Sequence, residues 1–309
     1  MEFVLNFRNI KLDISHPSSK MIRLGGKRIS RIMSASGAWA VAKQDMDILI
    51  NKWKFQTIVS KTCTLNPKPG NPEPNFVNLQ RERLSLNCMG MPNHGFEYYK
   101  NLLPYFQSQG VDYILSMDGT NIDDLIHMLA RYSSFIKSPQ IVEINLSCPN
   151  TSNTIPSYSI EYLETLLFKK FRGYDFKNLA IGLKLSPILD PSLLVDTAAL
   201  INRYSSKYRH ITHLVCSNSI PNGLLLDESQ KPVLSSWFGG ISGYPAKLLA
   251  LGNVYKLRKM LEPNIQIIGC GGIETMKDVQ DYLSCGASGV QIGRAIHTKQ
   301  LKMDFLEAE

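Results

Sequence analysis

The 309-residue sequence lacks any apolar run long enough to cross a bilayer, since no segment reaches roughly 18 uncharged apolar residues. Its first residues, Met-Glu-Phe-Val-Leu-Asn-Phe, carry an acid at position 2 and resemble neither a signal peptide nor a transit peptide. Low-complexity tracts, long linkers and short-period repeats are also missing, and the prolines and glycines are scattered. We therefore expect one soluble, cytoplasmic domain over residues 1–309, with no membrane contact.

Metal-binding cysteine patterns are also missing. The six cysteines show no C-x-x-C spacing and have no paired histidines nearby, which argues against a zinc site or an iron–sulfur cluster. Several lie in apolar runs, where a free thiol behaves as a small core residue. We expect reduced thiols and no bound metal. The cysteines are Cys63, Cys88, Cys148, Cys216, Cys270 and Cys285.

A dense run of basic residues is the last notable absence. The net charge of +8 would suit a nucleic-acid binder, a protein that attracts small anions, or simply a soluble protein. Because the basic residues are dispersed, we favour the attraction of small anions or plain solubility and expect no nucleic-acid partner.

Short apolar runs alternate with longer amphipathic stretches along the chain. Repeated β-α units predict parallel strands with right-handed crossovers, and eight units is the number found in a (β/α)8 barrel. The alternative is an open doubly wound sheet, but the first strand is followed by Ser34-Ala-Ser-Gly37 and not by the glycine-rich fingerprint of that fold. The predicted strands are 31–35, 57–63, 112–117, 141–147, 179–186, 211–219, 265–269 and 289–293. The predicted helices are 43–53, 95–109, 121–136, 159–171, 191–204, 244–261, 275–285 and one beginning after Ala295.

Two connections are too long for simple barrel loops. Residues 64–93 follow the second predicted strand, and residues 220–243 follow the sixth. Long segments at this end of a barrel usually cover an active site. The expected architecture is thus a single (β/α)8 TIM barrel with an N-terminal β-hairpin and long loops over its C-terminal face.

One cysteine lies where an apolar strand becomes a loop, in the string Glu143-Ile-Asn-Leu-Ser-Cys-Pro-Asn150. Loops at the carboxyl ends of barrel strands build the active site, and Pro149 ends strand pairing because it has no N–H. Cys148 is therefore the candidate catalytic group. The alternative is a buried structural thiol.

Three glycine groups follow the last three predicted strands or their loops: Gly239-Gly-Ile-Ser-Gly243, Gly269-Cys-Gly-Gly272 and Gly293-Arg294. Barrels often hold a phosphate at this place through backbone N–H groups, and Arg294 would add a forked charge-assisted contact. The other interpretation is that the glycines only permit tight turns.

Lys61 and Lys184 each lie inside an otherwise apolar strand, where a lysine is costly unless it faces an anion or an electron-rich ligand. A lysine at a strand end that reaches solvent is the other interpretation. Together with the glycine groups they indicate a large, partly anionic cofactor. Asparagines gather at strand ends and in the long loops, where they suit a flat heterocycle such as a pyrimidine or serve as turn formers. They are Asn87, Asn93, Asn145, Asn150, Asn218 and Asn222.

With these residues in view, the chain resembles the dihydroorotate dehydrogenases, most closely the soluble class 1A branch, over nearly its whole length. The resemblance rests on two specific strings, Asn87-Cys-Met-Gly-Met-Pro-Asn93 and Asn145-Leu-Ser-Cys-Pro-Asn150, and on five shorter ones. The shorter ones are Ser60-Lys-Thr62, Gly70-Asn-Pro72, Gly182-Leu-Lys-Leu185, Asn218-Ser219 and Gly269-Cys-Gly-Gly-Ile273.

The resemblance implies FMN at the barrel mouth and oxidation of (S)-dihydroorotate to orotate in pyrimidine biosynthesis. Cys148 would take a proton from C5 while a hydride passes from C6 to flavin N5. It also implies fumarate as the acceptor and a homodimer. The catalytic set would be Cys148, Lys61, Asn145 and Ser147. The substrate would be held by Lys61, Asn87, Met89, Gly90, Met91, Asn145, Asn150, Asn218 and Ser219. FMN would be held by Ala35, Ser36, Gly37, Lys61, Thr62, Asn145, Lys184, Ser217, Gly243, Cys270, Gly271, Gly272, Gly293 and Arg294.

Three positions depart from the class 1A pattern. Asn75 stands where the pattern has arginine, the stretch Leu234–Phe238 lacks a lysine usual there, and Arg294 stands in place of threonine. Arginine at that last position is similar to the dihydrouridine synthases and dihydropyrimidine dehydrogenases. Two alternatives therefore remain: an FMN-dependent reductase of that kind, and a flavin-binding protein without turnover. A partner subunit that carries electrons elsewhere is also open.

Overall fold

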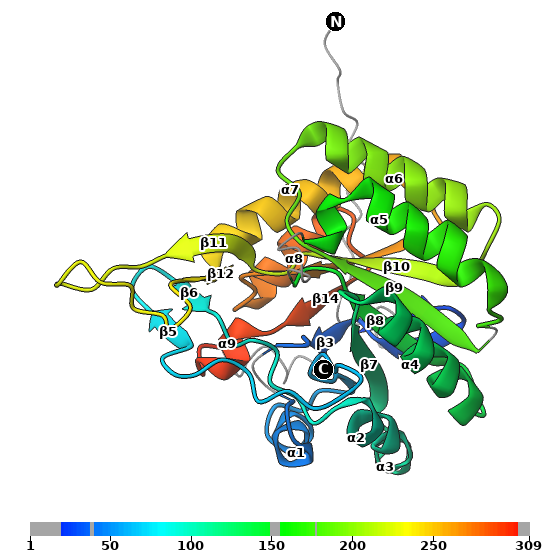
Figure 1. Cartoon of the computed structure of the whole chain (residues 1–309), viewed down its shortest axis with the longest axis horizontal. Helices are drawn as coiled ribbons and strands as arrows, with labels where there is room; N and C mark the ends of the chain where they lie inside the picture. The colour runs from blue at the N-terminus through cyan, green and yellow to red at the C-terminus, as the bar shows by residue number, and fades with distance from the viewer. Residues whose placement is uncertain (1–19, 38–39, 149–154, 177, 302–309) are drawn as a thin grey trace, which may run out of the picture.

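The computed structural model describes residues 20–37, 40–148, 155–176 and 178–301. Eight parallel strands form its central sheet, in the spatial order β3-β14-β13-β10-β9-β8-β7-β4 (Figure 1). Helices lie between most successive strands along the chain, so the predicted barrel is confirmed, with strand ends shifted by a few residues. The strands are β3 (Ile32–Ser34), β4 (Thr57–Val59), β7 (Asp112–Asp118), β8 (Gln140–Asn145), β9 (Leu179–Leu185), β10 (Ile211–Cys216), β13 (Gln266–Cys270) and β14 (Gly289–Ile292).

Side-chain hydroxyl groups join β4 to β3 and to Ser30, two residues before β3; β3 and β4 are the two ends of the sheet order. The N–H of Val59 donates to Ser34 Oγ over 3.1 Å, and the N–H of Ser30 donates to Thr57 Oγ1 over 3.1 Å. Both bonds satisfy backbone donors that are buried at this seam. The sheet is thus nearly closed into a barrel.

An N-terminal hairpin covers the amino-terminal end of the barrel. Its turn residue Gly25 has φ +55°, and a Cβ there would lie 2.3 Å from the Cβ of Ala180, near the start of β9. Leu24, at the end of the first hairpin strand, is fully buried. The hairpin thus closes one end of the barrel and leaves the opposite mouth for ligands. Its strands are β1 (Met21–Leu24) and β2 (Lys27–Ser30), which pair antiparallel.

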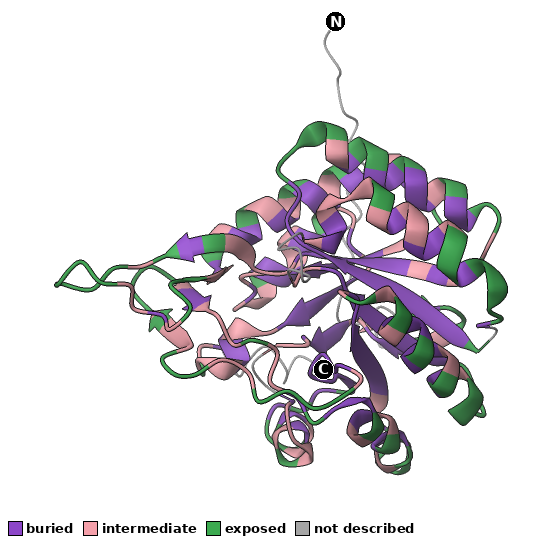
Figure 2. Ribbon diagram, in the orientation of Figure 1, coloured by how far each residue is buried: buried purple, intermediate pink, exposed green. Residues whose placement is uncertain are grey.

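The helices surround the sheet with their apolar faces inward, and the strands between them are almost entirely buried (Figure 2). The predicted helix over 95–109 is divided into α2 and α3, with Pro104 near the start of the second, where its missing N–H costs least. The predicted helix over 159–171 continues from α5 into a π-helical turn, η3 (Thr165–Lys170). The α-helices are α1 (Lys43–Asn51), α2 (Phe96–Asn101), α3 (Leu103–Ser108), α4 (Ile122–Phe135), α5 (Ile160–Glu164), α6 (Pro191–Ser205), α7 (Tyr244–Met260), α8 (Met276–Ser284) and α9 (Arg294–His297).

The two long connections form a second sheet, which the sequence did not predict. Its order is β11-β12-β6-β5, and it projects to one side of the barrel mouth (Figure 1). β12 and β6 pair antiparallel, with Gly240 opposite Asn87. We call this four-stranded sheet the lid sheet. Its strands are β5 (Phe76–Leu79), β6 (Leu84–Asn87), β11 (Ile220–Leu224) and β12 (Phe238–Gly243).

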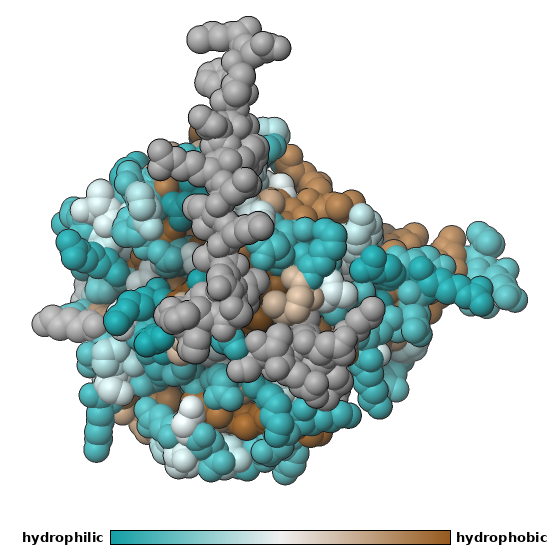
Figure 3. All heavy atoms as spheres, turned by 180° about the vertical axis from the view of Figure 1, so that it is seen from behind, coloured by the Kyte–Doolittle hydropathy of each residue, from teal (hydrophilic) through white to brown (hydrophobic). Residues whose placement is uncertain are grey.

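On the face seen from behind, the described surface is mostly hydrophilic, and hydrophobic residues show mainly toward the side where the lid sheet projects (Figure 3). Exposed large apolar side chains on the lid sheet and on α7 include Leu224, Trp237, Phe238 and Leu248. Among the described residues, no helix has both the length and the apolar character needed to span a membrane.

Candidate active site at the barrel mouth

A cavity of about 460 Å³ lies at the carboxyl ends of the barrel strands, beside the lid sheet. Its lining contains every predicted site residue except Asn150, which lies outside the described residues. Seven of the eight barrel strands, or the loops that follow them, contribute to this set, and the other members come from the lid sheet and the loop after β6. The predicted residues in the lining are Ala35, Ser36, Gly37, Lys61, Thr62, Asn87, Met89, Gly90, Met91, Asn145, Ser147, Cys148, Lys184, Ser217, Asn218, Ser219, Gly243, Cys270, Gly271, Gly272, Gly293 and Arg294.

Cys148 lies in the loop after β8. The turn that leads to it is fixed by Asn145, whose Oδ1 accepts a hydrogen bond of 3.1 Å from the N–H of Ser147. Burial raises the pKa of the Cys148 thiol to about 11; Asp118 adds to the rise, and Lys61 opposes it. The thiol is therefore protonated at neutral pH when no ligand is bound.

Lys61 follows β4 and is only 7% exposed. Its Nζ donates to the carbonyl oxygen of Gly37 over 2.9 Å. Burial lowers the pKa of Lys61 to about 8, and Lys184 lowers it further, while Cys148 acts in the opposite direction. An ammonium group has three donors, so Lys61 retains capacity to bind an anion in the cavity.

Lys184, on β9, belongs to a largely buried polar network inside the barrel. Its Nζ lies 3.5 Å from Glu143 Oε1 and donates to Gln291 Oε1 over 3.0 Å and to Ser36 Oγ over 3.3 Å. Ser36 Oγ donates in turn to Glu143 Oε1 over 2.8 Å, and Gln291 Nε2 donates to the other carboxylate oxygen. Burial acts to lower the pKa of Lys184, but Cys270 and Glu143 outweigh it and the pKa is raised. Lys184 therefore stays cationic.

The sequence analysis missed Glu143 and Gln291. Glu143 lies in the apolar run Ile141-Val-Glu-Ile144, which is the same signal that marked Lys61 and Lys184. A fully buried carboxylate needs a partner, so this residue was identifiable as half of an ion pair. Gln291 carried no such signal, because a single amide in a strand is compatible with many environments.

Amide and hydroxyl groups connect the loops on the other side of the cavity. Asn145 Nδ2 donates to Thr62 Oγ1 over 3.4 Å, and Asn218 Nδ2 donates to Asn145 Oδ1 over 3.3 Å. On the lid sheet, Asn87 Nδ2 donates to the carbonyl oxygen of Gly240 over 3.3 Å. By contrast, Asn93 is buried away from the cavity lining and bonds Thr64 and Met91, so it is a structural residue.

The three glycine groups meet at one place. Gly243 has φ +97°, and a Cβ there would lie 2.2 Å from the carbonyl oxygen of Arg83. Gly272 has φ +60°, and its Cβ would lie 2.5 Å from the carbonyl oxygen of Gly243. Only glycine fits such positions. Together with Gly271 and Gly293 in the cavity lining, they form a side-chain-free cradle that suits an anionic group such as a phosphate.

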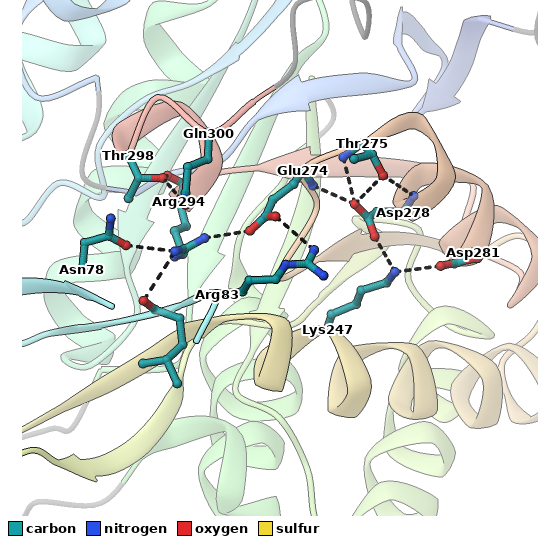
Figure 4. A network of polar contacts seen from close by, with 11 residues as sticks. Asn78, Arg83, Lys247, Glu274, Thr275, Asp278, Asp281, Arg294, Thr298 and Gln300 are labelled. Carbon is teal, nitrogen blue, oxygen red and sulfur yellow. Dashed lines mark hydrogen bonds and ion pairs between the residues drawn. The ribbon is translucent and has the colours of Figure 1, made fainter. Parts of the chain in front are cut away.

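Arg294 follows Gly293 and reaches across to the lid sheet (Figure 4). Its Nη1 donates to Glu274 Oε1 over 2.7 Å, and its Nη2 donates to Asn78 Oδ1 over 2.9 Å. Both terminal nitrogens are thus bonded to protein, so a contact with a phosphate would fall to the N–H groups of Arg294 that these bonds leave over. The Nε atom is buried and has no hydrogen-bond partner within the described ranges.

Neutral hydrogen bonds occupy the region where the class 1A pattern has two cations. Asn75 Nδ2 donates to the carbonyl oxygen of Asn71 over 3.0 Å, and Asn71 Nδ2 donates to Ser236 Oγ over 3.1 Å. Ser235 Oγ donates to the carbonyl oxygen of Pro72 over 2.7 Å. The two loops that cover the cavity are therefore joined without charged groups at these positions.

Known proteins of one family are similar to this chain over most of its length. The family model described as dihydroorotate dehydrogenase matches residues 24–304. A relative from Streptococcus equi subsp. equi, named as a dihydroorotate dehydrogenase A (fumarate), is 35% identical over 272 residues, which covers 86% of this chain and 83% of the relative. One from Streptococcus pyogenes serotype M5, with the same name, is 35% identical and covers 89% of each chain.

A solved structure, that of DHODH from Eimeria tenella in complex with ferulenol, superposes with a TM-score of 0.74. The alignment covers 99% of this chain and 86% of that one at 19% identity, so it supports the fold alone.

Proposed function

The chain belongs to the dihydroorotate dehydrogenase family, and from this premise we propose that it oxidises (S)-dihydroorotate to orotate, with FMN as cofactor, Cys148 as general base and fumarate as acceptor. The observation that carries the proposal is a single cavity in which Cys148 and Lys61 lie together with the glycine cradle. An oxidoreductase of this family needs both parts, a proton acceptor for the substrate and a binding place for a flavin.

The residues present fit FMN. The cradle of Gly243, Gly271, Gly272 and Gly293 would take the phosphate, because its backbone is free of side chains; a Cβ on Gly243 or Gly272 would clash with neighbouring backbone. Lys184 would lie at the polar edge of the flavin ring, where its permanent positive charge favours added negative charge. When bound, FMN supplies the hydride acceptor. The remaining flavin contacts would come from Ala35, Ser36, Gly37, Lys61, Thr62, Asn145, Ser217, Cys270 and Arg294.

The chain's own residues supply substrate binding and proton transfer. Lys61, a buried cation near Cys148, would bind the dihydroorotate carboxylate. Asn87, Asn145 and Asn218 would pair with the amide groups of the ring, each as donor and acceptor. The backbone of Met89, Gly90 and Met91, the side chain of Ser219 and Asn150 would complete this set.

Cys148 would accept the C5 proton as a thiolate. Because its pKa is about 11, the thiol must first lose its own proton, and the positive charge of Lys61 favours that loss. Ser147 and Asn145 would hold the loop in place through the bond between the Ser147 N–H and Asn145 Oδ1.

Fumarate is the acceptor that the names of the relatives suggest. Like the substrate it carries carboxylate groups, so Lys61 would serve both half-reactions. We extend the proposal to a cytoplasmic homodimer, which the class 1A resemblance implies. Light scattering on the purified protein would test the oligomeric state.

The decisive experiment adds dihydroorotate anaerobically to the FMN-loaded protein and follows the yellow flavin absorbance. Wild type should bleach, Cys148→Ala should not, and fumarate should restore the colour. Cys285→Ala, which removes a thiol at the end of α8 outside the cavity lining, is the matched control and should bleach like wild type. A flavin-loaded wild type that stays yellow would refute the assignment.

A further inference from the structure

A chain of charged residues ties the lid sheet to the barrel beside the glycine cradle (Figure 4). Glu274 precedes α8 and uses both carboxylate oxygens, one 2.7 Å from Arg294 Nη1 and the other 3.0 Å from Arg83 Nη2. Arg83 adjoins β6, and Arg294 also bonds Asn78 of β5 over 2.9 Å. We call Arg294, Glu274, Arg83 and Asn78 the lid clamp.

The lid clamp is strongest at its inner end. The side chain of Arg294 is 5% exposed and that of Glu274 is 14% exposed, whereas Arg83 is 47% exposed. Charge-assisted bonds between poorly solvated groups are the stronger ones, so the inner pair should hold its geometry. Backbone contacts support the same place, because the N–H of Tyr244 donates to the carbonyl oxygen of Arg83 over 2.9 Å.

The lid clamp and the loop of Met89, Gly90 and Met91 lie at opposite ends of β6. We call this loop the substrate loop. β6 begins at Leu84, whose carbonyl oxygen accepts a weak bond of 3.4 Å from Arg294, and ends at Asn87. A strand of this length spans roughly 10 Å. Met89, Gly90 and Met91 follow directly and line the cavity. Contacts that hold the start of β6 in place therefore also set the distance between these three residues and the barrel mouth.

The third nitrogen of Arg294, Nε, indicates that a ligand binds on the side of the residue that faces the cradle. Nε is buried and lacks a hydrogen-bond partner within the described part of the chain, although a buried donor left unpaired is costly. The same residue lines the cavity and directly follows Gly293 of the cradle. An oxygen of a phosphate in the cradle would complete the set of donors.

We propose that Arg294 links cofactor binding to substrate recognition: its Nε–H binds an oxygen of the phosphate in the cradle, while its two terminal nitrogens hold the β5–β6 hairpin through the lid clamp. Filling the cradle then orders the hairpin that carries the substrate loop. This inference rests on the proposed function, which supplies a phosphate-bearing flavin and a substrate bound under the lid sheet. Because the coupling is thermodynamic, ordering the hairpin also strengthens cofactor binding by the same factor.

Asn78→Ala is the variant that isolates the link. Asn78 is exposed and touches neither the cavity nor the cradle, so the change removes one arm of the lid clamp and leaves Arg294, Glu274 and the cradle in place. Arg294→Lys keeps a positive charge but removes the fork and the Nε–H. Lys277→Ala is the matched control, because Lys277 forms an exposed ion pair with Asp281 on α8 that does not reach the lid sheet.

Hydrogen exchange of residues 76–87 should be measured in the full-length protein without ligand, with inorganic phosphate and with FMN. In wild type and in Lys277→Ala, both ligands should slow exchange of the hairpin. In Asn78→Ala, the slowing should be lost, the KM for dihydroorotate should rise roughly tenfold with little change in kcat, and the Kd for FMN should rise by no more than the same factor, because the two effects are linked. Arg294→Lys should lose the slowing and also bind FMN roughly tenfold more weakly.

Two results would overturn the proposal, and they are distinguishable. If wild type binds FMN and hairpin exchange stays the same with and without it, the coupling fails while the proposed function stands. If wild type binds neither FMN nor phosphate, the proposed function itself fails. An Asn78→Ala variant that retains both the wild-type KM and the ligand-dependent slowing would also refute the link.

Discussion

The rate of flavin reduction should rise steeply with pH, because the proposed base is a thiol that is mostly protonated. With a pKa of about 11, roughly one Cys148 in 10⁴ is a thiolate at pH 7, and each pH unit increases that fraction tenfold. The first-order rate of flavin reduction should therefore increase about 100-fold between pH 6 and pH 8. Lys61 has a pKa of about 8 in the ligand-free site, and a bound substrate carboxylate would raise it, so at saturating dihydroorotate the rise should continue above pH 8 while Lys61 stays charged.

Anaerobic stopped-flow absorbance at saturating dihydroorotate, from pH 5.5 to 9.5, measures this rate directly. Cys148→Ser provides the comparison, because a serine hydroxyl has a much higher pKa and its rate should be far lower across the whole range. A rate that does not change between pH 6 and pH 8 would contradict the assignment of Cys148 as base. A plateau already reached at pH 7 would mean that the bound substrate lowers the pKa of the thiol far more than the surrounding residues do.

Three further substitutions test individual charges. Asp118→Asn removes a negative charge that raises the pKa of the catalytic thiol, so flavin reduction at pH 7 should become a few-fold faster and the pH profile should move to lower pH; an unchanged profile would contradict this. Glu143→Gln leaves the buried ammonium of Lys184 without its counter-charge and should lower the free energy of unfolding by about 3 kcal/mol, measured by urea denaturation; a change under 1 kcal/mol would show that the buried pair contributes little. Asp278→Asn breaks the buried pair with Lys247 and should cost about 2–4 kcal/mol at pH 7. Because the folded pKa of Asp278 lies below 3.8, that cost should be complete above roughly pH 4 and should shrink as the pH falls through the lowered pKa; a difference that grows in acid would refute this account.

The barrel could be predicted from the sequence because parallel strands buried on both faces appear as continuous apolar runs. Leu179–Leu185 is buried throughout, and its one lysine stands out against that background. The spacing of apolar residues in the helices was equally informative. Caps such as Asn121, whose side chain accepts from two backbone N–H groups, also mark helix starts. The ends of the strands were predicted less accurately, because strand pairing stops gradually, one residue after another.

The lid sheet could not be predicted in the same way. β12 contains three glycines in six residues, and β11 contains Pro221 and Gly223, so neither has the composition of a strand. The glycines are needed there because partners approach closely: a Cβ on Gly240 would lie 2.2 Å from Ser219 Oγ. The partner that makes β12 a strand is β6, about 150 residues earlier in the chain, and local sequence carries no information on such a pairing.

Arg294 shows the same limit for a single side chain. The sequence places it after a glycine in a predicted phosphate site, and in the structure both Gly293 and Arg294 line the cavity. Its bonding partners are 20 and 216 residues away, so its engagement with Glu274 and Asn78 was not foreseeable. The reductase alternative drew support from an arginine at this position. Since one of its terminal nitrogens bonds Asn78 of the lid sheet and the other bonds Glu274, the residue has a role in this chain that requires no RNA substrate.

The three cations that line the cavity differ in what neutralises them, and this difference has a chemical consequence. Lys184 lies against Glu143 and Arg294 against Glu274, so both cations on the cofactor side keep their charge at any pH near neutrality. Lys61 bonds a backbone carbonyl oxygen, and none of the ion pairs in the described part of the chain gives it a carboxylate. Burial lowers its pKa to about 8, and no carboxylate among the described residues offsets that shift, so Lys61 is the one of these three cations whose charge responds to its surroundings near neutral pH. A substrate carboxylate would restore that charge on binding, and the restored charge would in turn favour the thiolate of Cys148. Substrate binding and activation of the base would thus be linked through a lysine to which the described residues give no counter-ion.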